Sequence, residues 1–317
     1  MAKYIFGIDI GGTTVKMGLF TGEGKLCEKW EITTTAVEND NTAILKDIVA
    51  AMKAKQAEKG IADEDVLGVG MGVPGPVLSD GTVNKCANLK WGVFNVEEAM
   101  SELCGFPVKA GNDANVAALG EQLCGGGAGY GSVIMITLGT GVGAGVVLDG
   151  RIIPGAFGAA GEVGHMHVND DEQDVCGCGR RGCLEQYASA GGIKRVASRY
   201  LKAHPELDTP LGRSVEINSI NIFRTGRGGD AAGQGIIGEY FDILGRALAH
   251  MSTVIDPEAY VIGGGVSNEG PYLAEGIEKA FKKYCFHASS NARITLARLG
   301  NDAGIYGACG MVMNSQK

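Results

Sequence analysis

The sequence predicts an α/β protein built from two similar halves. Three observations support this: apolar runs that end in Gly/Thr turns, helical periodicity between those runs, and a second copy of the strand–turn–strand pattern later in the chain. The 317 residues suffice for two domains, and an apolar share of 45% can support a large core. The 52 glycines, about twice the usual share, indicate many tight turns or close backbone approaches.

The first half begins with three predicted strands separated by turns. These strands are the apolar runs 4–10, 15–20 and 26–34. Apolar residues at helical spacing then predict an amphipathic helix over 41–59. Val66–Met71 predicts a buried strand that enters a loop containing Gly75.

The second half repeats this plan. Apolar strands at 132–138 and 144–148 flank a turn at Gly139–Gly143, and Asp149-Gly150 predicts a hairpin turn into a further strand. The later elements are helices within about 185–250, a buried strand at 259–262 and a last helix near 303–312.

No segment of biased composition separates the halves, so the domain boundaries follow the repeated pattern. We place a small α/β domain at 1–112 plus about 303–317. A large α/β domain, which carries a cysteine-rich loop, then covers 113–302.

Charge and composition exclude several classes of protein. A net charge of −8 argues against a nucleic-acid partner, although backbone N–H groups can still hold an anionic small ligand. We see no secretory signal and no run of the roughly 18 apolar residues that a membrane span needs. We therefore expect a cytoplasmic protein with no membrane association, whose nine cysteines are thiols or metal ligands.

Two glycine turns and a third glycine loop suit a nucleotide. Consecutive N–H groups in such turns can point at one anion, and Asp9 ends an apolar strand, where a carboxylate is costly unless it is paired or near a metal. A plain hairpin turn is the alternative for each turn taken singly. The proposed nucleotide residues are Asp9, Gly11, Gly12, Thr13, Thr14 and Lys16 at the first turn, Thr140, Gly141, Val142 and Gly143 at the second, and Gly263, Gly264 and Gly265 at the third.

Asn112 and Asp113 precede a predicted helix at 114–121. Both residue types are common helix N-caps, and capping is the simpler interpretation. A carboxylate at a helix N-terminus also stays ionised at neutral pH, as a general base must. Capping and catalysis can therefore both hold for this pair.

The strongest single signal is a group of four soft metal ligands. His165, Cys176, Cys178 and Cys183 can form a closed tetrahedral zinc site, which would be structural because no ligand position is left for water. A loop without metal is the alternative. Glu162 and Glu185 flank the group and are either solvated surface residues or acceptors for sugar hydroxyls.

These motifs together resemble the ROK family of repressors, open reading frames and sugar kinases, and most closely its bacterial glucokinases. The resemblance is carried by DIGGTTVKMGLF, GVPGPV, NDANVAALGE, TLGTGVGAGVVLDG, GEVGHM, CGCGRRGCLEQYAS and VIGGGVS. It implies two ribonuclease H-like halves of the actin and sugar-kinase superfamily with an interdomain cleft. It also implies ATP and Mg²⁺ as cofactors, a structural Zn²⁺, a hexose substrate and a homo-oligomer, either dimer or tetramer.

The resemblance further implies a role for each site residue. Asp113 would take the proton from the sugar 6-hydroxyl as it attacks the γ-phosphate, most simply converting glucose to glucose 6-phosphate. Asp9 would act near Mg²⁺, and His165 would serve both zinc and sugar. The other hydroxyls would be held by Gly75, Asn112, Glu162, His165 and Glu185.

Two alternatives stay open at this stage, and we do not expect the third class, a repressor. A repressor would carry a helix-turn-helix segment before the first strand, which here begins at residue 4. A non-catalytic sugar sensor would lack the aspartate or the phosphate turns, and neither is missing. An N-acetylhexosamine or fructose kinase is the alternative within the enzymes. For the metal, we expect its removal to disturb the sugar side strongly and the nucleotide turns little.

Overall fold

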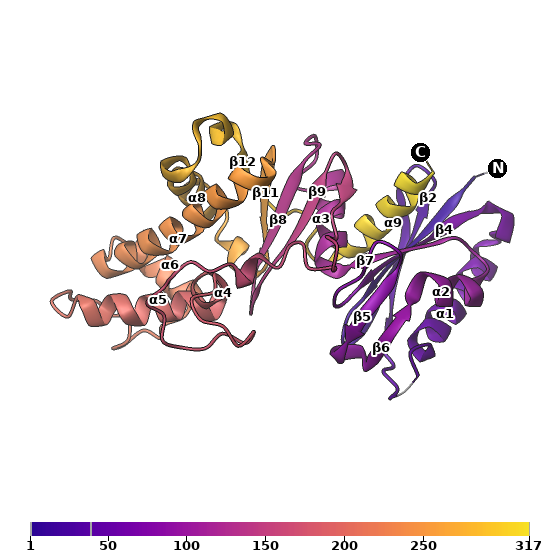
Figure 1. Ribbon diagram of the computed structural model, residues 1–317, viewed down its shortest axis with the longest axis horizontal. Coiled ribbons are helices and arrows are strands. Elements are labelled where there is room, and N and C mark those ends of the chain that lie inside the picture. Colours follow the sequence, from indigo (N-terminus) through magenta and orange to yellow (C-terminus); the bar gives the residue numbers. More distant parts are fainter. Residues whose placement is uncertain (1, 39, 317) are drawn as a thin grey trace. The chain divides into compact units, whose positions relative to one another are not determined.

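The computed structural model describes residues 2–38 and 40–316 and divides into two compact units (Figure 1). Residues 1, 39 and 317 of the predicted domain ranges lie outside the described residues. Unit 1 comprises Met1–Ser132, Gly145–Gly161 and Arg298–Lys317, and unit 2 comprises Val133–Ala144 and Glu162–Ala297. Residues 113–132, which the sequence assigned to the large domain, group with unit 1, because the helix they contain packs along the C-terminal helix.

The predicted helices and strands occur in the predicted order, together with further elements. Those before residue 133 are β1 (Tyr4–Ile10), β2 (Thr14–Thr21), β3 (Leu26–Thr33), α1 (Ala43–Lys59), β4 (Val66–Val73), β5 (Thr82–Cys86), β6 (Trp91–Asn95), α2 (Val96–Cys104), β7 (Val108–Asn112) and α3 (Asp113–Cys124). Those after it are β8 (Val133–Leu138), β9 (Val142–Leu148), β10 (Arg151–Ile152), α4 (Glu185–Ala188), α5 (Ala190–Ala203), α6 (Ser219–Arg227), α7 (Ala231–Ile255), β11 (Ala259–Gly263), α8 (Pro271–Tyr284), β12 (Arg293–Leu296) and α9 (Ala303–Ser315). Of these elements, β5, β6, α2, β7, α8 and β12 were not predicted.

Two five-stranded sheets have matching strand orders, β3-β2-β1-β4-β7 and β10-β9-β8-β11-β12. In the first, β1 pairs with β4 in parallel and β4 with β7 in parallel; in the second, β8 pairs with β11 and β11 with β12 in parallel. The predicted repeat of one α/β plan is therefore confirmed. The predicted hairpin turn is also present, with positive φ at both Asp149 and Gly150.

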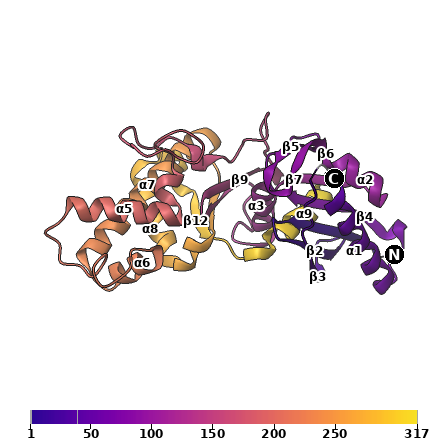
Figure 2. The same cartoon turned by 90° about the horizontal axis from the view of Figure 1, so that it is seen from below.

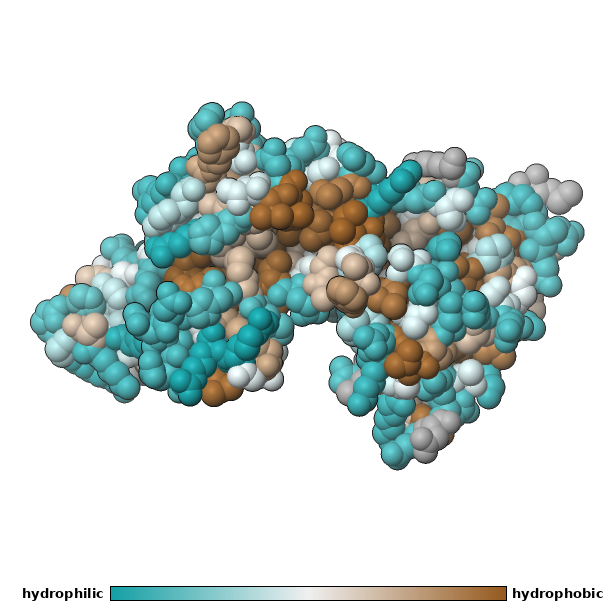
Figure 3. Space-filling view, viewed as in Figure 1, coloured by the Kyte–Doolittle hydropathy of each residue, from teal (hydrophilic) through white to brown (hydrophobic). Residues whose placement is uncertain are grey.

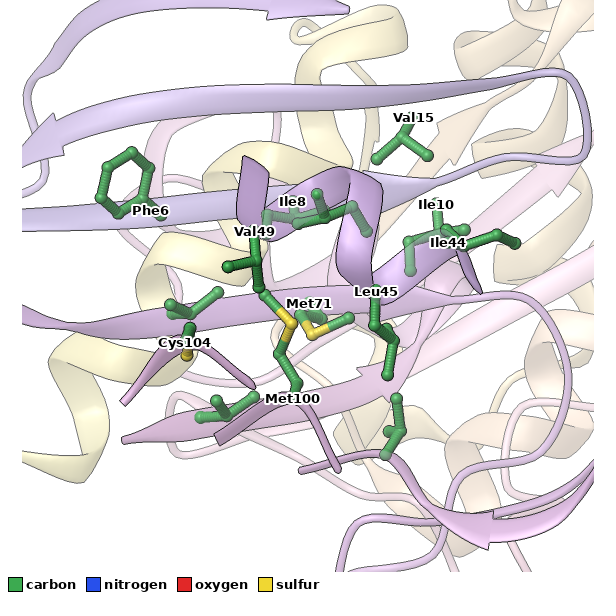
Figure 4. Close-up of a cluster of buried hydrophobic side chains, with 14 of the residues drawn as sticks. Phe6, Ile8, Ile10, Val15, Ile44, Leu45, Val49, Met71, Met100 and Cys104 are labelled. Atoms are coloured by element: carbon green, nitrogen blue, oxygen red, sulfur yellow. The ribbon is translucent and has the colours of Figure 1, made fainter. Parts of the chain in front are cut away.

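One face of the first sheet packs on α1 and α2. Phe6, Ile8 and Met71 from the strands meet Val49 and Met100 from the helices in one buried cluster (Figure 4). The helix expected at 41–59 is α1, whose apolar residues recur every three or four positions and face this cluster. Burial of this face supplies the main stabilisation of unit 1.

The other face of the sheet is covered by α9, with α3 lying along it (Figures 1 and 2). Glycines allow the close approach: a Cβ at Gly7 would overlap the carbonyl oxygen of Ile305, and one at Gly70 would overlap that of Ala308. Residues near the C-terminus therefore complete the core of the unit in which the chain begins.

Unit 2 is mainly helical around its parallel strands. The long helix α7 packs against α5, α6 and α8, and it buries the apolar residues that predicted it, including Ile236, Tyr240 and Leu244. The outward faces of α5 and α6 visible in Figure 3 are largely hydrophilic. Among the described residues, none of the helices combines the length and apolarity that a membrane span requires.

Candidate active site

The first glycine turn joins β1 to β2 beside a partly buried carboxylate. Gly11 N–H donates to the Thr14 carbonyl at 3.0 Å, while a Cβ at Gly12 would meet no atom within 4 Å. Asp9 lies opposite Lys16 in the strand register, with 3.9 Å between carboxylate oxygen and Nζ. Burial raises the pKa of Asp9, Lys16 lowers it, and the negative charge of Asp113 raises it. The carboxylates of Asp9 and Asp113 are close enough for the charge of one to act on the other. Mg²⁺ prefers oxygen ligands, so these two carboxylates fit a Mg²⁺ ion.

Asn112 and Asp113 lie where β7 meets α3. The Asn112 side-chain oxygen accepts from the N–H groups of Ala114 (3.0 Å) and Asn115 (3.2 Å), so it is the N-cap of α3. Its amide nitrogen donates to the Gly75 carbonyl and to Asp113 Oδ1, both at 3.0 Å. Asp113 Oδ1 also accepts from Ala114 N–H at 2.8 Å. The capping interpretation thus holds for Asn112, whose amide also orients the carboxylate beside it.

A buried glutamate at the other end of α3 was missed by the sequence analysis. Glu121 has 0% exposure, and its carboxylate accepts the N–H groups of Gly126 (2.7 Å), Arg298 (3.0 Å) and Leu299 (2.7 Å). Backbone donors alone can hold a buried carboxylate when several converge on it. The segment entering α9 is thereby fixed to the helix that begins with Asp113. The only signal in the sequence is that Glu121 lies two turns along α3 from Asp113, next to the small Gly120.

The second glycine turn joins β8 to β9, and two residues at the start of α4 and α5 hydrogen-bond to it. Val142 N–H donates to Glu185 Oε2 at 2.9 Å, and Ala190 N–H donates to the Gly139 carbonyl at 2.8 Å. The third glycine loop lies against the same turn, since a Cβ at Gly264 (φ 80°) would overlap the backbone of Leu138. The second and third predicted nucleotide segments are therefore neighbours.

The four predicted metal ligands converge. Ligand atoms of His165, Cys176, Cys178 and Cys183 all lie within 4.8 Å of one another. Cys178 Sγ is 3.6 Å from Cys183 Sγ, and Cys176 Sγ is 3.8 Å from His165 Nδ1. Zinc–sulfur bonds of about 2.3 Å in a tetrahedron require sulfur–sulfur distances of about 3.8 Å. The geometry fits zinc.

The pKa values of two of the thiols are shifted in opposite directions. Hydrogen bonding from the Arg180 backbone lowers the pKa of Cys178 to about 6, which makes its thiolate available as a ligand at neutral pH. Burial, with the neighbouring thiols of Cys178 and Cys176, raises the pKa of Cys183 to about 12. Three thiols packed this closely cannot all ionise unless a positive ion joins them.

Sugar-facing residues predicted in unit 2 adjoin this metal group. His165 turns Nδ1 toward Cys176, while its Nε2 lies 3.9 Å from Glu162 Oε2. One ring nitrogen can thus serve the metal while the other faces the Glu162 side, as the sequence suggested. Glu185 begins α4, two residues after Cys183, and is the residue bound to Val142. The second nucleotide turn therefore contacts a residue two positions after a metal ligand, and the expectation that metal removal disturbs the nucleotide turns little stays a prediction.

A second buried carboxylate, also missed from the sequence, supports the metal loop. The Glu172 side chain is only 4% exposed and accepts from Tyr187 Oη (2.6 Å), Arg199 (3.0 Å) and Arg195 (3.2 Å). Burial alone would raise the pKa of Glu172, but the hydrogen bonds and the Arg199 charge lower it to about 2. Because Tyr187 lies on α4 and both arginines on α5, Glu172 ties the loop to the helix that carries Glu185.

Comparison with known proteins fits this arrangement. The model of the ROK family matches residues 5–315. The chain belongs to the ROK family. It is 35% identical over 318 residues to a glucokinase of Halalkalibacterium halodurans, covering 99% of this chain and 96% of that one. It is 32% identical to the N-acetylgalactosamine kinase AgaK of a Shewanella species, covering 96% and 94%.

A solved ROK structure is similar across the whole fold. The ROK glucokinase of Streptomyces griseus, in complex with glucose and AMPPNP, is 34% identical with a TM-score of 0.68, over 97% of this chain and 98% of that one. The predicted sugar-kinase type of fold is confirmed for this ROK protein.

Proposed function

We propose that this ROK protein transfers the γ-phosphate of ATP to the 6-hydroxyl of a hexose, and that the hexose is glucose. Support comes from ROK relatives that are glucokinases and from the arrangement around Asp113. That arrangement carries the proposal, since a non-catalytic sugar sensor would have no use for a carboxylate oriented in this way beside a phosphate turn.

Asp113 is proposed as the general base. The Ala114 N–H and the Asn112 amide both donate to Oδ1 and hold the carboxylate in one orientation. The carboxylate accepts the proton of the 6-hydroxyl as that oxygen attacks the phosphorus. Phosphoryl transfer depends chiefly on positioning and charge neutralisation, so one well-placed acceptor is enough proton chemistry.

The remaining hydroxyls of the sugar are assigned to Gly75, Asn112, Glu162, His165 and Glu185. Carboxylates accept hydrogen bonds from hydroxyl pairs, while the amide and imidazole groups can donate as well as accept. Zinc, when bound, orients the His165 ring and fixes the loop that carries its ligands.

Nucleotide binding is assigned to the three glycine segments. Gly11–Thr14 with Lys16, and Thr140–Gly143 apart from the Val142 N–H that Glu185 accepts, offer N–H and hydroxyl donors to the phosphates, and Gly263–Gly265 lies by the adenosine. Mg²⁺, when bound near Asp9, neutralises charge on the phosphate oxygens. Asp9 itself holds the ion, directly or through water.

A panel of sugars with ATP and Mg²⁺ tests the proposal. ADP release should be greatest with glucose, and the product should be oxidised by a dehydrogenase specific for glucose 6-phosphate. Preference for N-acetylgalactosamine or N-acetylglucosamine would assign the chain to the other kinase class in its family, and preference for fructose would assign a fructokinase. Sugar binding without turnover of any sugar would identify a sensor and overturn the proposal.

The expected homo-oligomer and cytoplasmic location stay predictions. Size-exclusion chromatography with light scattering distinguishes a monomer, a dimer and a tetramer at a mass of 32.8 kDa per chain. Fractionation of cells that express the natural gene tests the location.

A further inference from the structure

The Glu185 carboxylate is in direct contact with the second glycine turn. Oε2 of Glu185 accepts the Val142 N–H at 2.9 Å. A Cβ placed on Gly141 would overlap that same oxygen and lie 3.4 Å from the carboxyl carbon, with no other atom within 4 Å. A Cβ at position 141 would therefore force the end of the flexible Glu185 side chain to shift away from the Val142 N–H.

The contact is reinforced from the other end of α4. The N–H of Ala190, the first residue of α5 and two positions after α4 ends, donates to the Gly139 carbonyl at 2.8 Å. Residues 185 and 190 thus bracket the turn with two hydrogen bonds. One of the two Glu185 oxygens is committed to the turn, and this bond sets the direction of the side chain.

We propose that Gly141 and the Val142 N–H are positioning groups for Glu185, so that the second glycine turn shapes the sugar site as well as the phosphate site. The inference rests on the proposed function, in which Glu185 accepts sugar hydroxyls. The second glycine turn would then position a sugar-binding side chain in addition to binding phosphate.

Coupling between the two ligands follows. A sugar bound to Glu185 restrains the turn through the Val142 bond, and a phosphate bound to the turn restrains Glu185 in return. A sugar hydroxyl that donates to Glu185 also spreads its negative charge, which eases the approach of a phosphate. Each ligand therefore strengthens binding of the other, and by linkage the two factors are equal.

Gly139 offers a matched control for Gly141. Both glycines lie in the same turn, neither has a positive φ, and a Cβ at Gly139 would meet no atom within 4 Å. Gly139→Ala and Gly141→Ala therefore add the same methyl group at two places, of which only one overlaps Glu185.

The test is glucose affinity measured by calorimetry without nucleotide. Gly141→Ala should weaken glucose binding about tenfold, as expected when a charged hydrogen bond is displaced, while Gly139→Ala stays within twofold of wild type. Zinc content and Tm verify that each variant is folded. Equal glucose affinity in Gly141→Ala and wild type would overturn the inference, even if nucleotide binding were lost.

A double-mutant cycle keeps the test valid if Gly141→Ala alone is unstable. Glu185→Asp shortens the side chain and vacates the space that the added methyl group of Gly141→Ala would fill. The tenfold effect should then shrink to less than twofold in the Glu185→Asp background, and the double variant should fold. Additive effects would refute the coupling. Failure of the proposed function is distinguishable, since it appears as absence of glucose phosphorylation by the wild type.

Discussion

The two glycine turns have the same proposed task but are supported in different ways. The first turn is held by Thr34, the residue that follows β3. The Thr34 N–H donates to the Thr13 carbonyl, and the Thr34 hydroxyl donates to the Gly11 carbonyl. The second is held by Glu185 and Ala190, which follow the metal loop. Similar turns can therefore respond differently to the same perturbation. The second should respond to events at the metal and sugar, and the first should not.

Replacement of Asp113 should have the largest effect and leave both turns intact. Asp113→Asn keeps the hydrogen bond from Ala114 but removes the proton acceptor, so kcat should fall by roughly 10²–10⁴-fold. Glucose and ATP affinities, measured by calorimetry, should change less than about threefold. A near-normal kcat would eliminate Asp113 as the base.

Loss of the metal should affect the second glycine turn and not the first. Purified protein should contain about one zinc per chain, measured by elemental analysis, and Cys178→Ser should lose it. Glucose affinity should then fall about 10–100-fold, and nucleotide affinity should fall several-fold through Glu185 and the second turn. Cys27→Ser, on β3 in unit 1, is the control and should keep zinc and both affinities.

The outcome of this experiment decides between two views of the second turn. If glucose affinity falls and nucleotide affinity does not, the second turn is as independent of the metal as the first. If a folded, zinc-free variant binds both ligands normally, the metal stabilises only the loop that carries its own ligands.

Removal of the Glu172 charge should weaken unit 2 in a pH-dependent manner. The folded pKa of about 2 lies below the ordinary 4.5, so the carboxylate contributes stability above pH 4.5 that is lost as pH falls toward 2. Glu172→Gln should cost up to about 3 kcal/mol at pH 7, and less at pH 3. Urea unfolding at both pH values measures this, with the neighbouring exposed Asp171→Asn as control. A loss of equal size at both pH values would assign the effect to packing.

The smallest expected effect is confined to the first turn. Thr34→Val removes a hydroxyl that donates to the Gly11 carbonyl at 2.7 Å. The loss of about 1 kcal/mol should weaken ATP binding about fivefold and leave glucose binding unchanged. Thr33→Val, on the exposed side of β3, should alter neither. A change in glucose affinity would show that the first turn is also coupled to the sugar.

Local patterns predicted most of the elements and the metal ligands. Periodicity located α1 and α7, and the spacing of His165 and the three cysteines located the cluster, because these signals lie within short stretches of chain. The capping role of Asn112 could be predicted for the same reason.

Long-range polar contacts could not be predicted. Glu121 bonds to residues 177 and 178 positions later, and Glu185 bonds to a residue 43 positions earlier. Nothing in a single sequence distinguishes a buried glutamate from the many exposed ones, because its burial depends on donors that only the fold brings near. The contact between the second turn and Glu185 could not be predicted for the same reason.

The placement of α9 has a consequence for the order in which the protein is made. Ile305, Cys309 and Val312 complete a core with Ile5 and Phe20, yet the ribosome makes the residues between Gly161 and Arg298 before α9. At ordinary synthesis speeds that interval is on the order of ten seconds. For that time one face of the first sheet is uncovered, while unit 2 can already fold. The unit that starts first therefore finishes last, and one apolar face of its sheet stays exposed on the nascent chain until α9 is made.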